Sequence, residues 1–141
     1  IKKMNYKIIA KYIKKINFVI PNPKTFFLLA ENISNYKINI EIKSNQIKEK
    51  IIEVETSLNL NPTKDDIEKI NTNIIFSTII ELDEKISNKV ELEKIILIKV
   101  PSEIYSEIRQ SFVFLFEKSG FKDVKIDKVV NFEKLYLERK N

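Results

Sequence analysis

Apolar and polar residues alternate in four segments of the N-terminal part of the chain, with the period of two that is typical of half-buried β-strands. The clearest alternation is at residues 36–43, where Tyr36, Ile38 and Ile40 stand between charged and amide residues. The other segments are residues 6–20, 52–60 and 70–80. Short connections that carry Asn, Pro and Asp favour antiparallel turns. We therefore predict a four-stranded antiparallel sheet, apolar on one face and polar on the other.

We assign the first segment, as one strand, to a single period-two pattern. This pattern predicts that Lys7, Lys11 and Lys15 share the polar face. The residues predicted on its apolar side are Tyr6, Ile8, Ala10, Tyr12, Ile16, Phe18 and Ile20.

Helices are predicted after the fourth strand, where the apolar period lengthens. A short helix at 90–99 is expected to be interrupted by Pro101, and a longer helix at 102–120 ends at the only glycine of the chain. Asn131 is placed to cap a final helix at 132–139. Strands followed by helices predict an α+β fold.

Within the longer helix, residues 112–116 are apolar on every side. A helix of this kind is buried on more than one face. Since a single sheet covers one face, we expect another subunit to cover the rest, with Phe112, Phe114 and Phe116 at the oligomer interface.

The connection after the first strand contains an apolar run, although loops usually lie on the surface and are polar. It begins at Pro21 and Pro23 and continues with Phe26, Phe27, Leu28 and Leu29. The residues alone leave two interpretations open, which are a short helix packed at the sheet edge and a surface that faces a ligand.

The length of 141 residues predicts one domain over 1–141. The chain has no Cys and no His, which excludes disulfides and removes the commonest zinc ligands and the commonest general base. We therefore expect no enzymatic activity, no metal site and no cofactor. No apolar run approaches the ~18 residues of a membrane span, so we expect a cytoplasmic protein with no membrane insertion.

The net charge of +5 raises the alternative of an RNA-binding α+β protein that uses Lys7, Lys11 and Lys15. Most basic residues are lysines dispersed among glutamates, whereas base and phosphate recognition relies mainly on arginine. We therefore expect no nucleic-acid partner.

Five stretches, in this order, resemble the SecB protein-export chaperone family, and the resemblance extends over nearly the whole chain. They are KYIKKINFVIPNP, YKINIEI, KIIEVETSLNLN, LEKIILIKVPSEIYSEIRQSFVFLFEKSGF and VVNFEKLYL. The resemblance implies a four-stranded antiparallel sheet with helices on one face, assembled as a homotetrameric dimer of dimers. It also implies ATP-independent holding of unfolded secretory precursors and their handover to the motor SecA.

In this family the connection between the first two strands crosses the sheet and helps to wall an apolar groove for client chains. The resemblance implies that residues 21–35 form this connection here. The implied client contacts are Phe26, Phe27, Leu28, Leu29, Tyr36, Ile38, Ile40, Leu135 and Tyr136.

The chain departs from the family where SecA is expected to bind. Family members use acidic residues on the polar sheet face, at positions that correspond here to Lys15, Val19 and Asn73. They also carry a zinc-binding tail, which we do not expect in a chain without Cys or His. A SecB-like chaperone dedicated to one partner, such as an antitoxin, therefore stays open as an alternative to general export.

Overall fold

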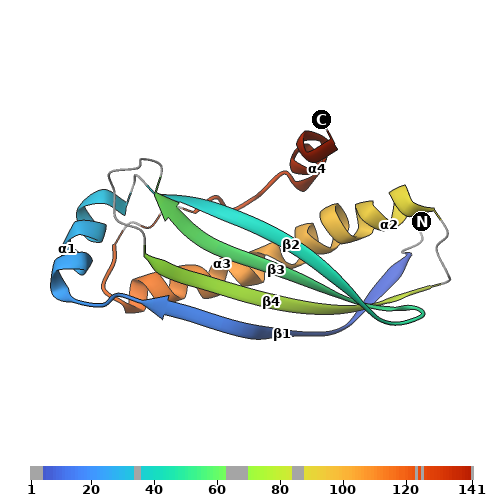
Figure 1. Ribbon diagram of the computed structural model, residues 1–141, viewed down its shortest axis with the longest axis horizontal. Helices are drawn as coiled ribbons and strands as arrows, with labels where there is room; N and C mark the ends of the chain where they lie inside the picture. Colours follow the sequence, from blue (N-terminus) through green and yellow to red (C-terminus); the bar gives the residue numbers. More distant parts are fainter. Residues whose placement is uncertain are drawn as a thin grey trace.

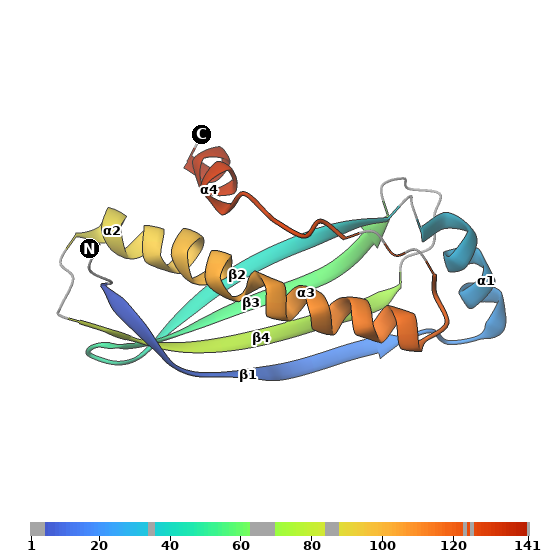
Figure 2. The same cartoon turned by 180° about the vertical axis from the view of Figure 1, so that it is seen from behind.

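The computed structural model describes residues 5–33, 36–62, 70–83, 88–122, 124 and 126–140. A long twisted sheet carries a nearly continuous helix across one face, and the other face is open (Figures 1 and 2). The elements are β1 (Tyr6–Val19), α1 (Pro23–Asn32), β2 (Tyr36–Lys48), β3 (Ile51–Pro62), β4 (Asn71–Leu82), α2 (Lys89–Lys94), the π-helix η2 (Ile95–Lys99), α3 (Val100–Lys118) and α4 (Phe132–Lys140). The predicted antiparallel sheet followed by helices is confirmed.

The strand order is β1-β4-β3-β2, and every neighbouring pair is antiparallel. β1 and β2 therefore form opposite edges of the sheet. The connection that contains α1 must pass from one edge to the other, and it does so around the end of the sheet (Figure 1). This agrees with the crossover that the family resemblance implies.

Two β-bulges in β1 overturn the single period-two assignment of that strand. They lie between Ile8 and Ala10 and between Ile13 and Lys15. An extra residue at a bulge moves every following side chain to the opposite face. Ala10 and Tyr12 consequently lie on the open face, opposite Ile79 and Ser77. The second bulge restores the original phase, so the predicted facing of Ile16 and Phe18 holds.

Lys11 is also moved by the first bulge, to the face that carries the helices. It lies opposite the buried Thr78, and its Nζ is 2.6 Å from Glu107 Oε1 of α3. Lys7 stays on the open face and pairs with Glu81 at 3.2 Å. The prediction that Lys7, Lys11 and Lys15 share the polar face is therefore wrong.

Pro101 does not interrupt the helix as predicted. It lies in the first turn of α3, directly after the π-helical turn Ile95–Lys99. Proline lacks the N–H for an i→i−4 bond and its ring crowds the carbonyl four residues earlier. The wider π turn accommodates this defect, so that α2, η2 and α3 run on without a break (Figure 2).

The core lies between α3 and the central strands β3 and β4. Phe112 and Phe116 are fully buried there, and the ring of Phe116 meets Phe18 edge-on at 4.9 Å. Phe114 points away from the core and is 56% exposed. Of the three residues predicted at an oligomer interface, Phe112 and Phe116 thus pack inside the chain itself, and Phe114 alone presents most of its ring to solvent.

Glu53 is a buried carboxylate on the open face of the sheet. Glu53 accepts hydrogen bonds from Ser77 Oγ at 2.7 Å, Lys14 Nζ at 3.1 Å and Asn45 Nδ2 at 3.2 Å. The Ser77 hydrogen bond is the largest cause that lowers the pKa of Glu53, and the bonds from Lys14 and Asn45 act in the same direction. Glu53 is therefore ionised at neutral pH, and it joins β3 to β1, β2 and β4.

Candidate functional site

β2 supplies an apolar strip at the edge of the sheet. Its residues Tyr36, Ile38, Ile40 and Ile42 face the same side as the helices and are only half-buried. α3 packs on β3 and β4, and among the helical elements η2 contacts β2. The strip is therefore available to a ligand along part of its length.

α4 lies beyond this edge of the sheet (Figures 1 and 2). Asn131 caps it as predicted, because its Oδ1 accepts the N–H of Lys134 at 3.0 Å. Phe132 and Tyr136 are buried, whereas Leu135 is 40% exposed. Leu135 therefore stands between the buried side of the helix and the β2 strip.

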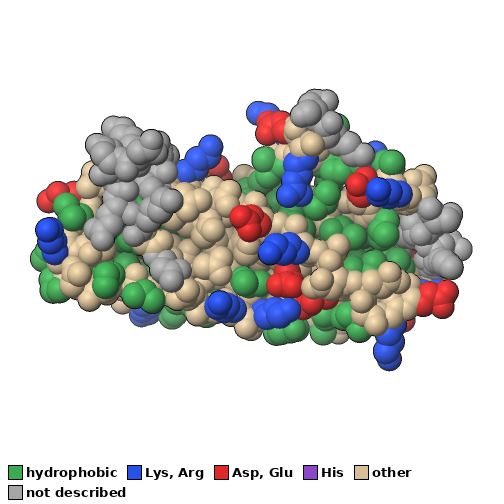
Figure 3. Space-filling model, viewed as in Figure 1, with side chains coloured by type: hydrophobic (Ala, Val, Ile, Leu, Met, Phe, Trp, Pro, Cys, Tyr) green, Lys and Arg blue, Asp and Glu red, His purple; other side chains and the backbone are tan. Residues whose placement is uncertain are grey.

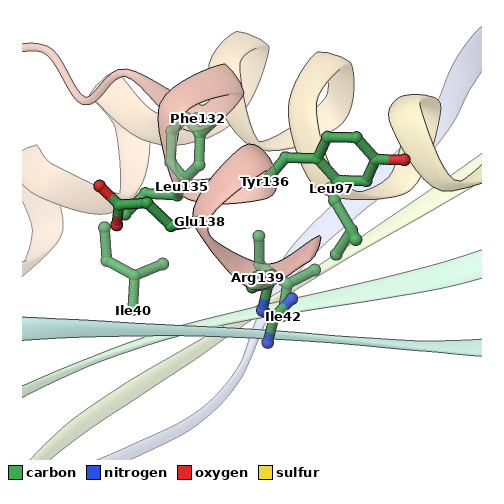
Figure 4. A pocket seen from close by; sticks show the side chains of 8 residues that line it. All are labelled: Ile40, Ile42, Leu97, Phe132, Leu135, Tyr136, Glu138 and Arg139. Carbon is green, nitrogen blue, oxygen red and sulfur yellow. The ribbon is translucent and has the colours of Figure 1, made fainter. Parts of the chain in front are cut away.

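Two adjoining hollows separate α4 from β2. The smaller has a volume of about 250 Å³ and contains Glu138 and Arg139 at the charged end of α4 (Figure 4). Its apolar lining consists of Ile40, Ile42, Leu97, Phe132, Leu135 and Tyr136.

The larger hollow has a volume of about 440 Å³ and continues along β2 toward its start. Its lining consists of Tyr36, Lys37, Ile38, Asn39, Ile40, Tyr105, Ile126, Asp127, Val130 and Leu135. Ile40 and Leu135 belong to both hollows, so the two form one groove along the edge strand. We call it the β2–α4 groove.

The structure brings together the five groove residues that were expected on β2 and the last helix. It adds Leu97, Ile42 and Phe132, which were not predicted as site residues. Phe132 shares a helical face with Leu135 and Tyr136, so its spacing could have indicated it. Leu97 reaches the groove from the π turn, and a pattern of period 3.6 gives no signal for such a position.

The run at 26–29 forms part of helix α1, which the sequence had left as one of two possibilities. Asn22 Oδ1 caps this helix by accepting the N–H of Thr25 at 2.8 Å, and Pro23 occupies the first turn. Leu29 is 1% exposed and belongs to the core. Phe27 at 64% and Leu28 at 40% are exposed at the end of the molecule.

Phe26 differs from the buried Leu29 and from the exposed Phe27 and Leu28, because its ring packs on Phe121 with centroids 4.8 Å apart. The same ring lies 3.4 Å from the point where a Cβ at Gly120 would stand. Gly120 has a φ of 95°, which favours glycine, and it ends α3 at this point. Phe26 therefore fixes α1 to the turn after α3, and neither hollow of the β2–α4 groove includes a residue of 26–29.

The open face of the sheet does not present a basic surface. Lysines and glutamates alternate on it rather than separating by sign (Figure 3). Lys14 lies within 3.4 Å of Glu55 in addition to its contact with Glu53. The RNA-binding alternative depended on three lysines sharing this face, and Lys11 lies on the other one.

Within the described residues, no group of three or more His, Cys, Asp or Glu side chains is arranged to hold a metal ion. None of the helices described is long and apolar enough to span a membrane.

A comparison with known families shows which family the chain belongs to. The model for the preprotein translocase subunit SecB matches residues 2–141. This chain belongs to the SecB family. A relative from Pelagibacter ubique (strain HTCC1062), described as a protein-export protein SecB, is 39% identical over 137 residues, which cover 97% of this chain and 98% of that protein. The family assignment confirms the resemblance seen in the sequence and makes this protein a protein-export chaperone.

A solved structure agrees with the fold. The SecB-like chaperone of Mycobacterium tuberculosis, in complex with a peptide from an antitoxin, superposes with a TM-score of 0.65 and covers 89% of this chain and 88% of its own. The two sequences are 13% identical, so this likeness supports the SecB-like arrangement of sheet and helices and nothing finer.

The positions that correspond to the acidic residues of the SecB family lie on the open face. Lys15 is opposite Ile75, Val19 is opposite Asn71, and Asn73 is opposite Asn17. None of these positions is acidic in this chain. Glu53 is a buried carboxylate of this face, and its hydrogen bonds are used within the sheet.

Proposed function

We propose that this protein holds unfolded secretory precursors in the β2–α4 groove without ATP or any catalytic step. The observation that carries the proposal is the groove itself, which presents Ile40 and Leu135 to both of its hollows. A surface of exposed aliphatic and aromatic side chains can bind many sequences through apolar burial alone. Binding the unfolded state also prevents folding by mass action, so no nucleotide is required.

The backbone of β2 is the second source of affinity in this proposal. Among the described strands β2 pairs only with β3, so its outer edge has N–H and C=O groups that can pair with an extended chain. An unfolded precursor offers the matching groups in every sequence. The combination therefore suits a chaperone with a broad range of clients.

Client contacts at α1 form a separate part of the proposal. Phe27 and Leu28 are exposed at the end of the molecule, away from both hollows. A long client that occupies the groove can also reach a second apolar surface, and two linked contacts bind more tightly than one. Leu29 would take no direct part, because the core covers it.

We further propose that the protein works in the cytoplasm as a dimer of dimers. Phe114 on α3 and the exposed Ile13 and Ile16 of β1 are apolar residues that a partner subunit would cover. We expect SecA to bind this protein more weakly than an acidic relative, because Lys15 and Asn73 replace carboxylates on the open face.

A chaperone dedicated to one partner is the second candidate. The observation that favours it is the antitoxin peptide bound to the structural neighbour of similar fold. A general holdase should protect several unrelated precursors with similar affinity. Protection of a single partner, with no effect on the others, would favour the dedicated chaperone.

The test is suppression of refolding. A destabilised precursor is diluted from denaturant into buffer without ATP, at one chaperone assembly per client, and recovery of its native fluorescence is followed. The wild-type protein should slow this recovery. Leu135→Glu should abolish the effect because it places a charge in both hollows, whereas Leu137→Glu should not, because Leu137 is on the same helix, 54% exposed, and outside both linings. Equal behaviour of the two variants, or an inactive wild-type protein, would refute the proposal.

A further inference from the structure

One wall of the β2–α4 groove has no regular secondary structure. It is the segment between α3 and α4, of which Ile126, Asp127 and Val130 line the larger hollow. Among the described residues of 122–130 there is no backbone–backbone hydrogen bond. Two side chains of α3, at positions 105 and 109, donate hydrogen bonds to carbonyl groups of this segment.

These two side chains bind consecutive carbonyl groups. The Tyr105 hydroxyl donates to the carbonyl oxygen of Asp127 at 2.6 Å, and Arg109 Nε donates to that of Ile126 at 2.9 Å. The donors are four residues apart, so they lie on one face of α3 in successive turns. Two bonds to adjacent peptide groups fix both the position and the direction of the wall at this point.

Tyr105 also links the wall to α4. Its ring meets Phe132, the first residue of α4, edge-on with centroids 5.9 Å apart. The side chain is only 4% exposed, and this burial raises the pKa of Tyr105. The hydroxyl therefore keeps its proton and its role as donor across the neutral range.

We propose that Tyr105 and Arg109 are positioning residues that hold the 126–131 wall in place and thereby set the width of the groove. This inference rests on the proposed function, because a defined width matters only if a chain binds there. A wall held before binding spares the complex the loss of entropy that ordering it would require. Arginine suits this task, because its planar guanidinium holds a hydrogen bond in a fixed direction where lysine would not.

The proposal is tested with variants that delete a donor and little else. Tyr105→Phe removes the hydroxyl and keeps the ring on Phe132, and Arg109→Met removes the guanidinium and keeps an apolar stem. Ser111→Ala is the matched control. Ser111 Oγ donates to the backbone carbonyl oxygen of Glu107 in the same helix at 3.1 Å, so this hydrogen bond does not involve the wall. Each variant is compared with the wild-type protein for client Kd, melting temperature and the rate of tryptic cleavage after Lys128.

The double variant should bind an unfolded fluorescent client roughly tenfold more weakly, the effect of losing one to two hydrogen bonds of ordinary strength. Cleavage after Lys128 should accelerate by a similar factor, because cleavage of a locally opened segment follows its open population. Cleavage after Lys43 on β2 should not change, which separates opening of the wall from global unfolding.

Two results would overturn the inference. One is an unchanged client Kd in the double variant together with a lower melting temperature, which would assign both side chains to stability alone. The other is an unchanged rate of cleavage after Lys128. A wild-type protein that binds no client refutes the proposed function instead, and the cleavage rates still report whether the two side chains hold the wall.

Discussion

Replacing Phe27 by serine separates the contribution of α1 to client binding from its contribution to the fold. Phe27 is 64% exposed, so of a Phe side chain of roughly 200 Å² about 130 Å² faces solvent. Covering this area completely would contribute about 3 kcal/mol to binding at about 25 cal/mol per Å². A client that covers half of it gains about 1.5 kcal/mol, which corresponds to roughly a tenfold change in Kd.

The assay is fluorescence anisotropy of a labelled unfolded client, with thermal unfolding measured on the same samples. Phe27→Ser should raise Kd roughly tenfold and leave the melting temperature nearly unchanged, because little of the ring is buried. Val19→Ser is the control, since Val19 is 46% exposed on the open face of the sheet and should affect neither quantity.

Leu29→Ala is the opposite case in the same helix. Leu29 is 1% exposed, so this change should lower the free energy of unfolding by about 2–5 kcal/mol and leave the client Kd of the folded protein unchanged. A client Kd that is the same for Phe27→Ser and for the wild-type protein would refute the argument and leave α1 with a structural role only.

Three further predictions concern the assembly, the core and the open face. Phe114→Glu should dissociate the assembly in sedimentation velocity with the circular dichroism of the fold retained, whereas Phe116→Glu should prevent folding because it buries an unpaired charge. Thr78→Val should raise the free energy of unfolding in urea by about 1 kcal/mol, because the buried Thr78 hydroxyl has no hydrogen-bond partner among the described residues. Glu53→Gln should destabilise the protein at neutral pH and weaken its acid sensitivity. The pKa of Glu53 is lowered from 4.5, so the stabilisation by its carboxylate is present above that value and is lost as the pH falls through the folded-state pKa. Urea titrations at neutral and acidic pH measure the free energy of unfolding of both proteins. Parallel pH profiles of variant and wild type would contradict the prediction.

The strands could be predicted because apolar and polar residues alternate along each of them, and the errors in the predicted facing arise where this alternation breaks. In β1 the alternation breaks at Ile8-Ile9-Ala10 and at Lys14-Lys15, and the strand inserts an extra residue against β4 at both places. A break in the alternation does not by itself identify a bulge, because a bulge is decided by the pairing with another strand. As a result the facing of Lys11 and Tyr12 was established only by the folded sheet.

The groove was predictable on β2 and α4 to the extent that an apolar face could be seen in each. Tyr36, Ile38 and Ile40 follow the strand period, and Leu135 and Tyr136 follow the helical one. The irregular wall carries no period, so its contribution to the groove had no signal in the sequence. Leu29 is buried and Phe27 is exposed because one side of the short helix α1 meets the core. Which side this is depends on tertiary packing and could not be predicted from the sequence of α1.

The position of β1 at the edge beside β4 has a consequence for the synthesis of the protein. β2, β3 and β4 follow one another along the chain and can pair as they emerge from the ribosome. β1 cannot pair until β4 has been synthesised, because Val19 pairs with Asn71 and Tyr6 pairs with Leu82. These partners are roughly 50–75 residues apart, so at about 5–20 residues per second β1 stays unpaired on the ribosome for roughly 3–15 s. During that interval the nascent chaperone exposes an extended apolar segment of the same kind that we propose it later holds in other proteins.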